Sequence, residues 1–116
     1  MAIITINLTL DGGVLKYQDD AGNWQTVDAG SPSTGVDSGD EVDWSGDDTI
    51  GKIKIKPNKN RILDRVDDDD TKKPKGKVKQ GLTGTITEKY TISVKPANGG
   101  GYTDFDPDLT YPKGGD

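Results

Sequence analysis

The stretch AIITINLTLDGGVLKY, residues 2–17, decides the fold class of this chain. Its apolar residues occupy every second position, which is the period of an extended strand with one buried face. These positions are Ala2, Ile4, Ile6, Leu8 and Leu10, with Thr5, Asn7 and Thr9 on the other face. The DGG at 11–13 tolerates positive φ, so residues 2–18 are expected to form two strands joined by a tight turn.

Further short strands are expected along the chain, at residues 24–27, 41–45, 50–56, 83–96 and 102–111. In KIKIK, Ile53 and Ile55 point inward and Lys52, Lys54 and Lys56 point outward, as in a sheet with one solvated face. Pro107 indicates an edge or a bulge in the last strand. Residues 28–40 have the composition of a loop.

Strands of this length, with turns every 8 to 12 residues, indicate an antiparallel Greek-key β-sandwich of about seven short strands, immunoglobulin-like in architecture. The length of 116 residues predicts a single domain, residues 1–116. Within it, residues 57–81 are interpreted as a charged, mobile excursion, in which RILDRV is either one short strand or a helical turn.

The composition excludes many kinds of chemistry. The chain has no cysteine and no histidine, which removes disulfides, the usual zinc and blue-copper sites, and histidine-based catalysis. Only 29% of the residues are hydrophobic, so the core is lean and leaves little room for a walled cleft. We expect no enzyme and no resident cofactor.

Four segments resemble small cupredoxin-like domains: GDEVDW (39–44), IGKIKI (50–55), EKYTISV (88–94) and DPDLTY (106–111). The resemblance covers about half of the chain and implies a sandwich in which a Gly-Asp turn opens one core strand. Copper-carrying members present Cys, His and Met in the loop before the last strand. The corresponding stretch here, NGGGYTDFDPD, has none of them, so the resemblance implies a fold without a copper site.

Two acidic motifs are candidate metal sites. Asp104, Asp106 and Asp108 form D-x-D-x-D, whose carboxylates are suited to calcium in a loop, whereas in an extended strand they form a solvated edge. The EF-hand pattern is not met. DDDD at 67–70 is either a ligand cluster or a solvated loop, and the repulsion between adjacent carboxylates favours the loop.

The aromatic residues suggest a second kind of site. Trp44 alternates with Val42 and is expected in the core, whereas Trp24 lies in a turn-rich stretch and is the candidate for an exposed contact with a protein or a sugar ring. Tyr17, Tyr102 and Tyr111 would complete an aromatic platform if they shared its face.

Charge is distributed unevenly along the chain. Residues 1–51 carry a net charge of −9, residues 52–89 of +6 and residues 90–116 of −2. The acidic remainder disfavours nucleic acid as a partner. Complementary acidic and basic faces on neighbouring copies would make a heterologous contact, which generates rings or open filaments. Strand 2–10 is either an edge that pairs with a neighbour's sheet or a strand within its own sheet.

The sequence therefore predicts a non-enzymatic structural or protein-interaction module that assembles with itself. The alternative is a calcium- or carbohydrate-binding module. The start MAIITINLTL has no basic leader, and no stretch is long enough to cross a membrane, so a cytoplasmic location without membrane contact is the simpler expectation, with export by another route left open.

Overall fold

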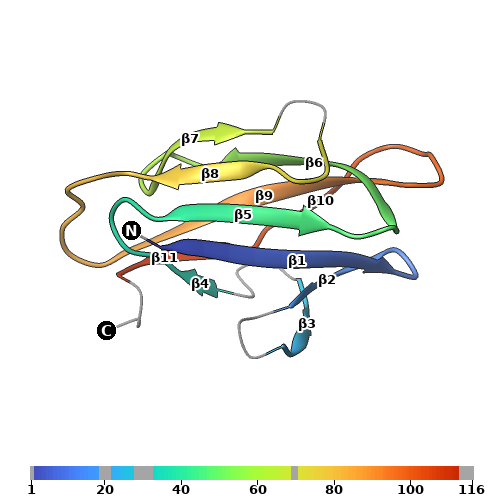
Figure 1. The fold of residues 1–116 in the computed structure, drawn as a ribbon, viewed down its shortest axis with the longest axis horizontal. Helices are drawn as coiled ribbons and strands as arrows, with labels where there is room; N and C mark the ends of the chain where they lie inside the picture. Colours follow the sequence, from blue (N-terminus) through green and yellow to red (C-terminus); the bar gives the residue numbers. More distant parts are fainter. Residues whose placement is uncertain (1, 19–21, 28–32, 69–70, 113–116) are drawn as a thin grey trace.

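The computed structural model describes residues 2–18, 22–27, 33–68 and 71–112, and these form two mixed β-sheets packed against each other (Figure 1). The described residues form strands, turns and bends and no helix. The expectation of an all-β fold is confirmed.

The described residues form eleven strands, which follow in chain order. They are β1 (Ile3–Asp11), β2 (Val14–Gln18), β3 (Trp24–Thr26), β4 (Ser33–Gly35), β5 (Glu41–Gly46), β6 (Ile50–Pro57), β7 (Leu63–Asp67), β8 (Lys75–Val78), β9 (Ile86–Pro96), β10 (Thr103–Phe105) and β11 (Asp108–Tyr111).

The first sheet has the strand order β3-β2-β1-β5-β8-β7. β1 and β2 form the expected antiparallel hairpin, whose turn uses Gly12 and Gly13 at φ 61° and 84°, a region that favours glycine. β1 pairs with β5 in parallel, which the long connection between them allows. Of the two alternatives for strand 2–10, the edge strand is wrong and the strand within its own sheet is confirmed, because β1 lies between β2 and β5.

The second sheet is built on β9, the longest strand. β6 pairs with one side of β9, and β10 and β11 pair with the other side, one after the other. The register continues unbroken across Pro107, since Phe105 lies opposite Ile92 and Asp108 opposite Lys89. The Pro107 carbonyl accepts the Tyr90 amide at 3.0 Å. β4 adds to β11 in parallel.

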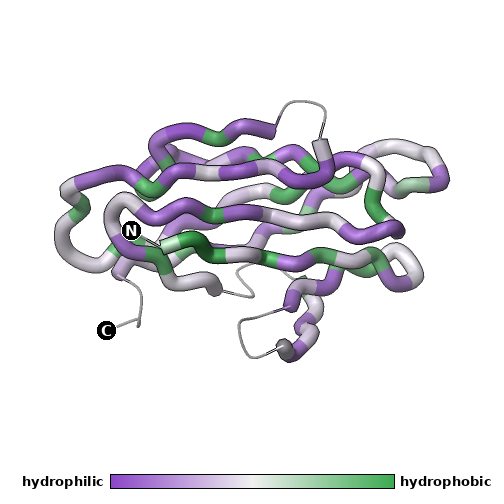
Figure 2. Tube along the Cα trace, in the orientation of Figure 1, coloured by the Kyte–Doolittle hydropathy of each residue, from purple (hydrophilic) through white to green (hydrophobic). Residues whose placement is uncertain are grey.

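Alternate residues of both sheets fill one hydrophobic core. In Figure 2 hydrophobic and hydrophilic stretches accordingly alternate along the strands. Trp44 is fully buried, as expected, and so is Ile53 of β6, while Ile55 is almost completely buried. The largest core side chains therefore come from the strands that the period-two pattern identified.

A buried carboxylate fixes the entry to β5. Asp40 is 3% exposed and accepts hydrogen bonds from the Ala2 and Asp37 amides, both at 2.9 Å. Gly39 has a φ of 81° in the same turn. The Gly-Asp turn thus ties the start of β1 to the start of β5, so Asp40 has a structural role.

Three sequence-based expectations differ from the structure. The sheets are mixed rather than antiparallel, because β1–β5 and β4–β11 are parallel, and period-two patterning carries no information on strand direction. The described strands outnumber the seven expected. The loop expected at 28–40 includes β4, a strand of only three residues without a readable alternation.

The segment 57–81 contributes β7 and β8, the outermost strands of the first sheet. Between its charged residues lie three apolar ones, Ile62, Leu63 and Val78, whose side chains are buried in the core. RILDRV is a strand at Leu63–Asp67 rather than a helical turn. β6, β7 and β8 lie together at one side of the molecule, and β2, β3 and β4 lie at the other (Figure 1).

Candidate functional site

The outer face of the second sheet carries three parallel columns of polar side chains. Alternation along each strand and the register between strands determine which residues share this face. The lysine column on β6 is Lys52, Lys54 and Lys56, the hydroxyl column on β9 is Thr91 and Ser93, and the aspartate column beside it is Asp104, Asp106 and Asp108.

Hydroxyl groups hold two of the three aspartates. Ser93 Oγ donates to Asp104 Oδ1 at 2.6 Å, and Thr91 Oγ1 donates to Asp106 Oδ1 at 2.8 Å. These bonds orient the exposed carboxylates toward the centre of the sheet. Asp108 is half-buried, and its Oδ1 has no hydrogen-bond partner among the described residues.

The lysine column faces solvent as the sequence predicted, with Lys54 and Lys56 exposed and Lys52 half-buried. The Lys54 ammonium lies 5.3 Å from the centroid of the Tyr102 ring. That distance is within the range of a cation–π contact. A basic stripe and an acidic stripe thus flank a central column on one solvated surface, and this column is uncharged at Thr91 and Ser93 but has Lys89 and Lys95 at its ends.

A depression of about 370 Å³ lies at the end of this face. Lys56, Asn58, Lys89, Thr91 and Asp106 contribute polar groups to its lining. This mixture of ammonium, amide, hydroxyl and carboxylate groups is suited to polar contacts with another surface. It contains no cysteine or histidine for nucleophilic or imidazole chemistry.

The aspartate column does not form a chelating group. Alternate residues of a strand lie about 7 Å apart, too far for their carboxylates to converge on one ion. Among the described residues, no group of three or more His, Cys, Asp or Glu side chains could hold a metal ion. The calcium site at Asp104, Asp106 and Asp108 stays a prediction that this arrangement does not favour.

The second acidic motif lies partly outside the described residues, which end at Asp68 and resume at Thr71. Asp68 Oδ2 accepts the Ile55 amide at 2.9 Å, and the Thr71 carbonyl accepts the Ile53 amide at 2.9 Å. These contacts cover the outer edge of β6. Asp68 therefore has a structural role.

The aromatic candidates do not form one platform. Trp24 is 48% exposed on β3, as the sequence suggested. Tyr17 is buried, with its hydroxyl 2.9 Å from Thr34 Oγ1, and Tyr111 donates to the Leu82 carbonyl at 2.7 Å. Tyr102 is exposed but lies next to β10 of the second sheet, so the condition for an aromatic platform, a face shared with Trp24, is not met.

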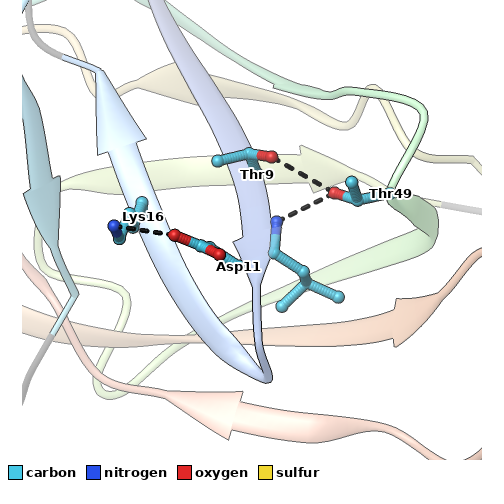
Figure 3. A network of polar contacts seen from close by, with 5 residues as sticks. Thr9, Asp11, Lys16 and Thr49 are labelled. Atoms are coloured by element: carbon cyan, nitrogen blue, oxygen red, sulfur yellow. Dashed lines mark hydrogen bonds and ion pairs between the residues drawn. The ribbon is translucent and has the colours of Figure 1, made fainter.

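A polar network joins the turn after β5 to β1 (Figure 3). Thr49 Oγ1 accepts the Leu10 amide at 2.9 Å and lies 3.3 Å from Thr9 Oγ1, while Lys16 pairs with Asp11 at 2.9 Å. Partial burial raises the pKa of Asp47, but hydrogen bonds from Thr49 and Thr9 outweigh it, so this pKa lies below its usual value. These contacts hold the turn after β5 and the start of β2 against the end of β1.

Sequence reasoning missed Ser93 and Thr91. The alternation in EKYTISV places both on the polar face of a strand, but nothing in the sequence says that β6 and β10 flank β9. Only the register brings a lysine column and an aspartate column to the same surface.

No protein-family model matches this chain, and no curated protein matches its sequence. Within the described residues, no helix is long and apolar enough to cross a membrane.

Proposed function

We propose that this protein is a non-enzymatic structural or protein-interaction module that self-associates through charged surfaces. The observation that carries the proposal is the separation of the lysine column from the aspartate column on one sheet face. Separated stripes of opposite charge select partners and their orientation, because they attract a surface on which opposite charges meet and repel one on which like charges meet.

The arrangement of the strands supports the same proposal at the scale of the whole molecule. The basic segment 52–89 supplies β6, β7 and β8, which gather at one side, whereas β1, β2 and β5 come from the acidic segment 1–51. Figure 2 shows hydrophilic residues along β7 and β8. A protein partner, including another copy, fits this surface better than nucleic acid does, since acidic groups are interspersed with the lysines.

The finer fold belongs to this proposal. We take the two packed sheets as a Greek-key β-sandwich of the cupredoxin or immunoglobulin type without a copper site. The absence of histidine and cysteine from the sequence supports a binding role rather than a catalytic or metal-dependent one.

The test is multi-angle light scattering on the purified protein from low to high micromolar concentration, at low and at high salt. Self-association predicts an average mass above 12.4 kDa that rises with protein concentration and falls with salt. A constant monomer mass under every condition would contradict the proposal of self-association.

A further inference from the structure

Resting on the proposed interaction function, we infer that the partner of the second sheet's outer face is a second copy of this chain, docked face to face about a two-fold axis parallel to β9. The inference depends on the order of the three columns. Since neighbouring strands lie about 4.8 Å apart, the lysine and aspartate columns are separated by about 10 Å, with the hydroxyl column midway.

Symmetry distinguishes two ways of stacking this face on itself. A two-fold axis that runs along β9 exchanges left and right, so each lysine column lies over the aspartate column of the other copy. An axis in the same plane but perpendicular to β9 leaves lysine over lysine and aspartate over aspartate. Charge complementarity therefore selects the first axis, and the contact is isologous and closed at two copies.

The residues at the centre of the face allow two copies to approach each other across such an axis. Thr91 and Ser93 are half-buried, uncharged and short, so the central strands of two copies can approach. Their hydroxyls already hold Asp104 and Asp106 by one oxygen each. These carboxylates are thus oriented before docking, which lowers the entropy lost when a lysine of the other copy binds them.

Two lysines oppose the association. Lys89 and Lys95 extend the central column of β9 at its two ends, so each approaches its own equivalent across the axis. Lys89 lies opposite Asp108 of β11, but Asp108 Oδ1 is buried, so this carboxylate offsets the repulsion only in part. Lys95 has Lys52 beside it on β6, so this end of the face is the weak end of the contact.

The size of the face indicates a weak dimer. Three strands, each used over about nine residues, cover about 14 Å by 27 Å, or about 400 Å² per copy. The total lies below the range of about 1,200–2,000 Å² that is typical of stable complexes. We therefore expect a salt-sensitive dimer that forms at high micromolar concentration, rather than a filament.

A single-cysteine cross-link tests the axis, because the chain has no cysteine of its own. Ser93→Cys places two thiols next to the axis, and a short bis-maleimide should join them into a covalent dimer at low salt but not at high salt. Thr91→Cys provides a second probe of the same column. The control is Thr5→Cys, an exposed position on the first sheet, which should remain monomeric.

Charge variants give a second readout by light scattering. Lys95→Ser should raise the dimer fraction at a given concentration, since it removes the like-charge pair at the axis. Lys54→Asp with Lys56→Asp should abolish the dimer, and so should Asp104→Lys with Asp106→Lys. An equimolar mixture of these two double variants should restore a mass near twice that of the monomer. Circular dichroism of each variant verifies folding.

The outcomes separate this inference from the broader proposal. Salt-sensitive self-association without cross-linking of either cysteine variant, and with a weaker association of Lys95→Ser, would overturn the two-fold face and leave self-association standing. A monomer in every condition, for the wild type and for Lys95→Ser, would overturn both. Cross-linking of Ser93→Cys and Thr5→Cys to equal extent would mean random collision and would also overturn the inference.

Discussion

Trp44 of β5 donates its indole N–H to the Tyr90 hydroxyl of β9 at 3.2 Å, and this bond joins the two sheets inside the core. The two rings are tilted by 58° with their centroids 5.7 Å apart. Both side chains are almost completely buried. Burial raises the pKa of Tyr90, so its hydroxyl stays protonated while its oxygen accepts the hydrogen bond from the indole N–H.

Tyr90→Phe should lower the free energy of unfolding by about 1–3 kcal/mol, because it leaves the indole N–H of Trp44 buried without an acceptor. Urea unfolding followed by circular dichroism measures the change. The control is Tyr102→Phe, which removes an exposed hydroxyl and should change stability by less than about 0.5 kcal/mol. Equal effects of the two substitutions would mean that the Trp44–Tyr90 bond contributes little.

Gly76→Ala should destabilise the protein by about 1–3 kcal/mol through overpacking. A Cβ at this position would lie 3.0 Å from Trp44 Cη2 and Cζ3 and 3.2 Å from Leu63 Cδ2. β8 thus contains a glycine because the Trp44 ring packs against its backbone. Gly101→Ala is the matched control, since a Cβ there meets nothing within 4 Å. If both variants unfold at the same urea concentration, the core tolerates the added methyl group.

A strand could be predicted from the sequence where its own residues show a regular alternation, and not where its position depends on other parts of the chain. β1, β2, β5 and β6 were readable because their apolar residues alternate over five or more positions. β4 has three residues, too few to show a period, and lies in the expected loop, whereas the strand expected at 102–111 is divided into β10 and β11. Strand direction and sheet order depend on long-range contacts, so the parallel pairs could not be predicted from local pattern.

The same reason limited the prediction of the site. Lys52, Lys54 and Lys56 were correctly placed on an outward face, and the three aspartates were recognised as an alternating acidic set. Their common surface depends on the register of β9 with its two neighbours, which no local motif encodes. The burial of two carboxylates, Asp40 and Glu88, was not predicted either, because burial of a charged residue is decided by tertiary packing.

Glu88→Gln should destabilise the protein by about 2 kcal/mol or more. The buried carboxylate accepts the Lys59 amide at 2.6 Å, and it accepts the Arg61 and Ile62 amides at 2.9 and 3.1 Å. A glutamine has one accepting oxygen in place of two. Its side-chain NH2 group would therefore lie against a buried backbone N–H, and two donors would meet without an acceptor.

The loss from Glu88→Gln should appear in the free energy of unfolding and in faster amide exchange over residues 58–62. Glu41→Gln is the comparison, since Glu41 is the only other glutamate and lies half-buried on the outer face of the first sheet. Unchanged exchange over residues 58–62 in the Glu88 variant would show that the carboxylate does not hold this loop.

Asp43→Asn should stabilise the protein at neutral pH and not at low pH. Burial raises the pKa of Asp43 above its usual value, the neighbouring Glu41 raises it further, and Lys75 partly opposes both. The folded protein therefore holds the Asp43 proton more tightly than the unfolded chain does. Stability of the wild type falls as the pH rises through this pKa, because the carboxylate ionises beside another acid.

Asparagine at this position carries no charge at any pH, so the variant escapes that loss. The gain should be below about 1 kcal/mol, since solvent screens a group on the sheet surface. Urea midpoints of both proteins from pH 3 to pH 8 should diverge as the pH rises and converge toward pH 3. Lys75→Met in the wild-type background removes the opposing cation and should move the wild-type decline to higher pH. Parallel curves for wild type and Asp43→Asn would refute the raised pKa as a source of instability.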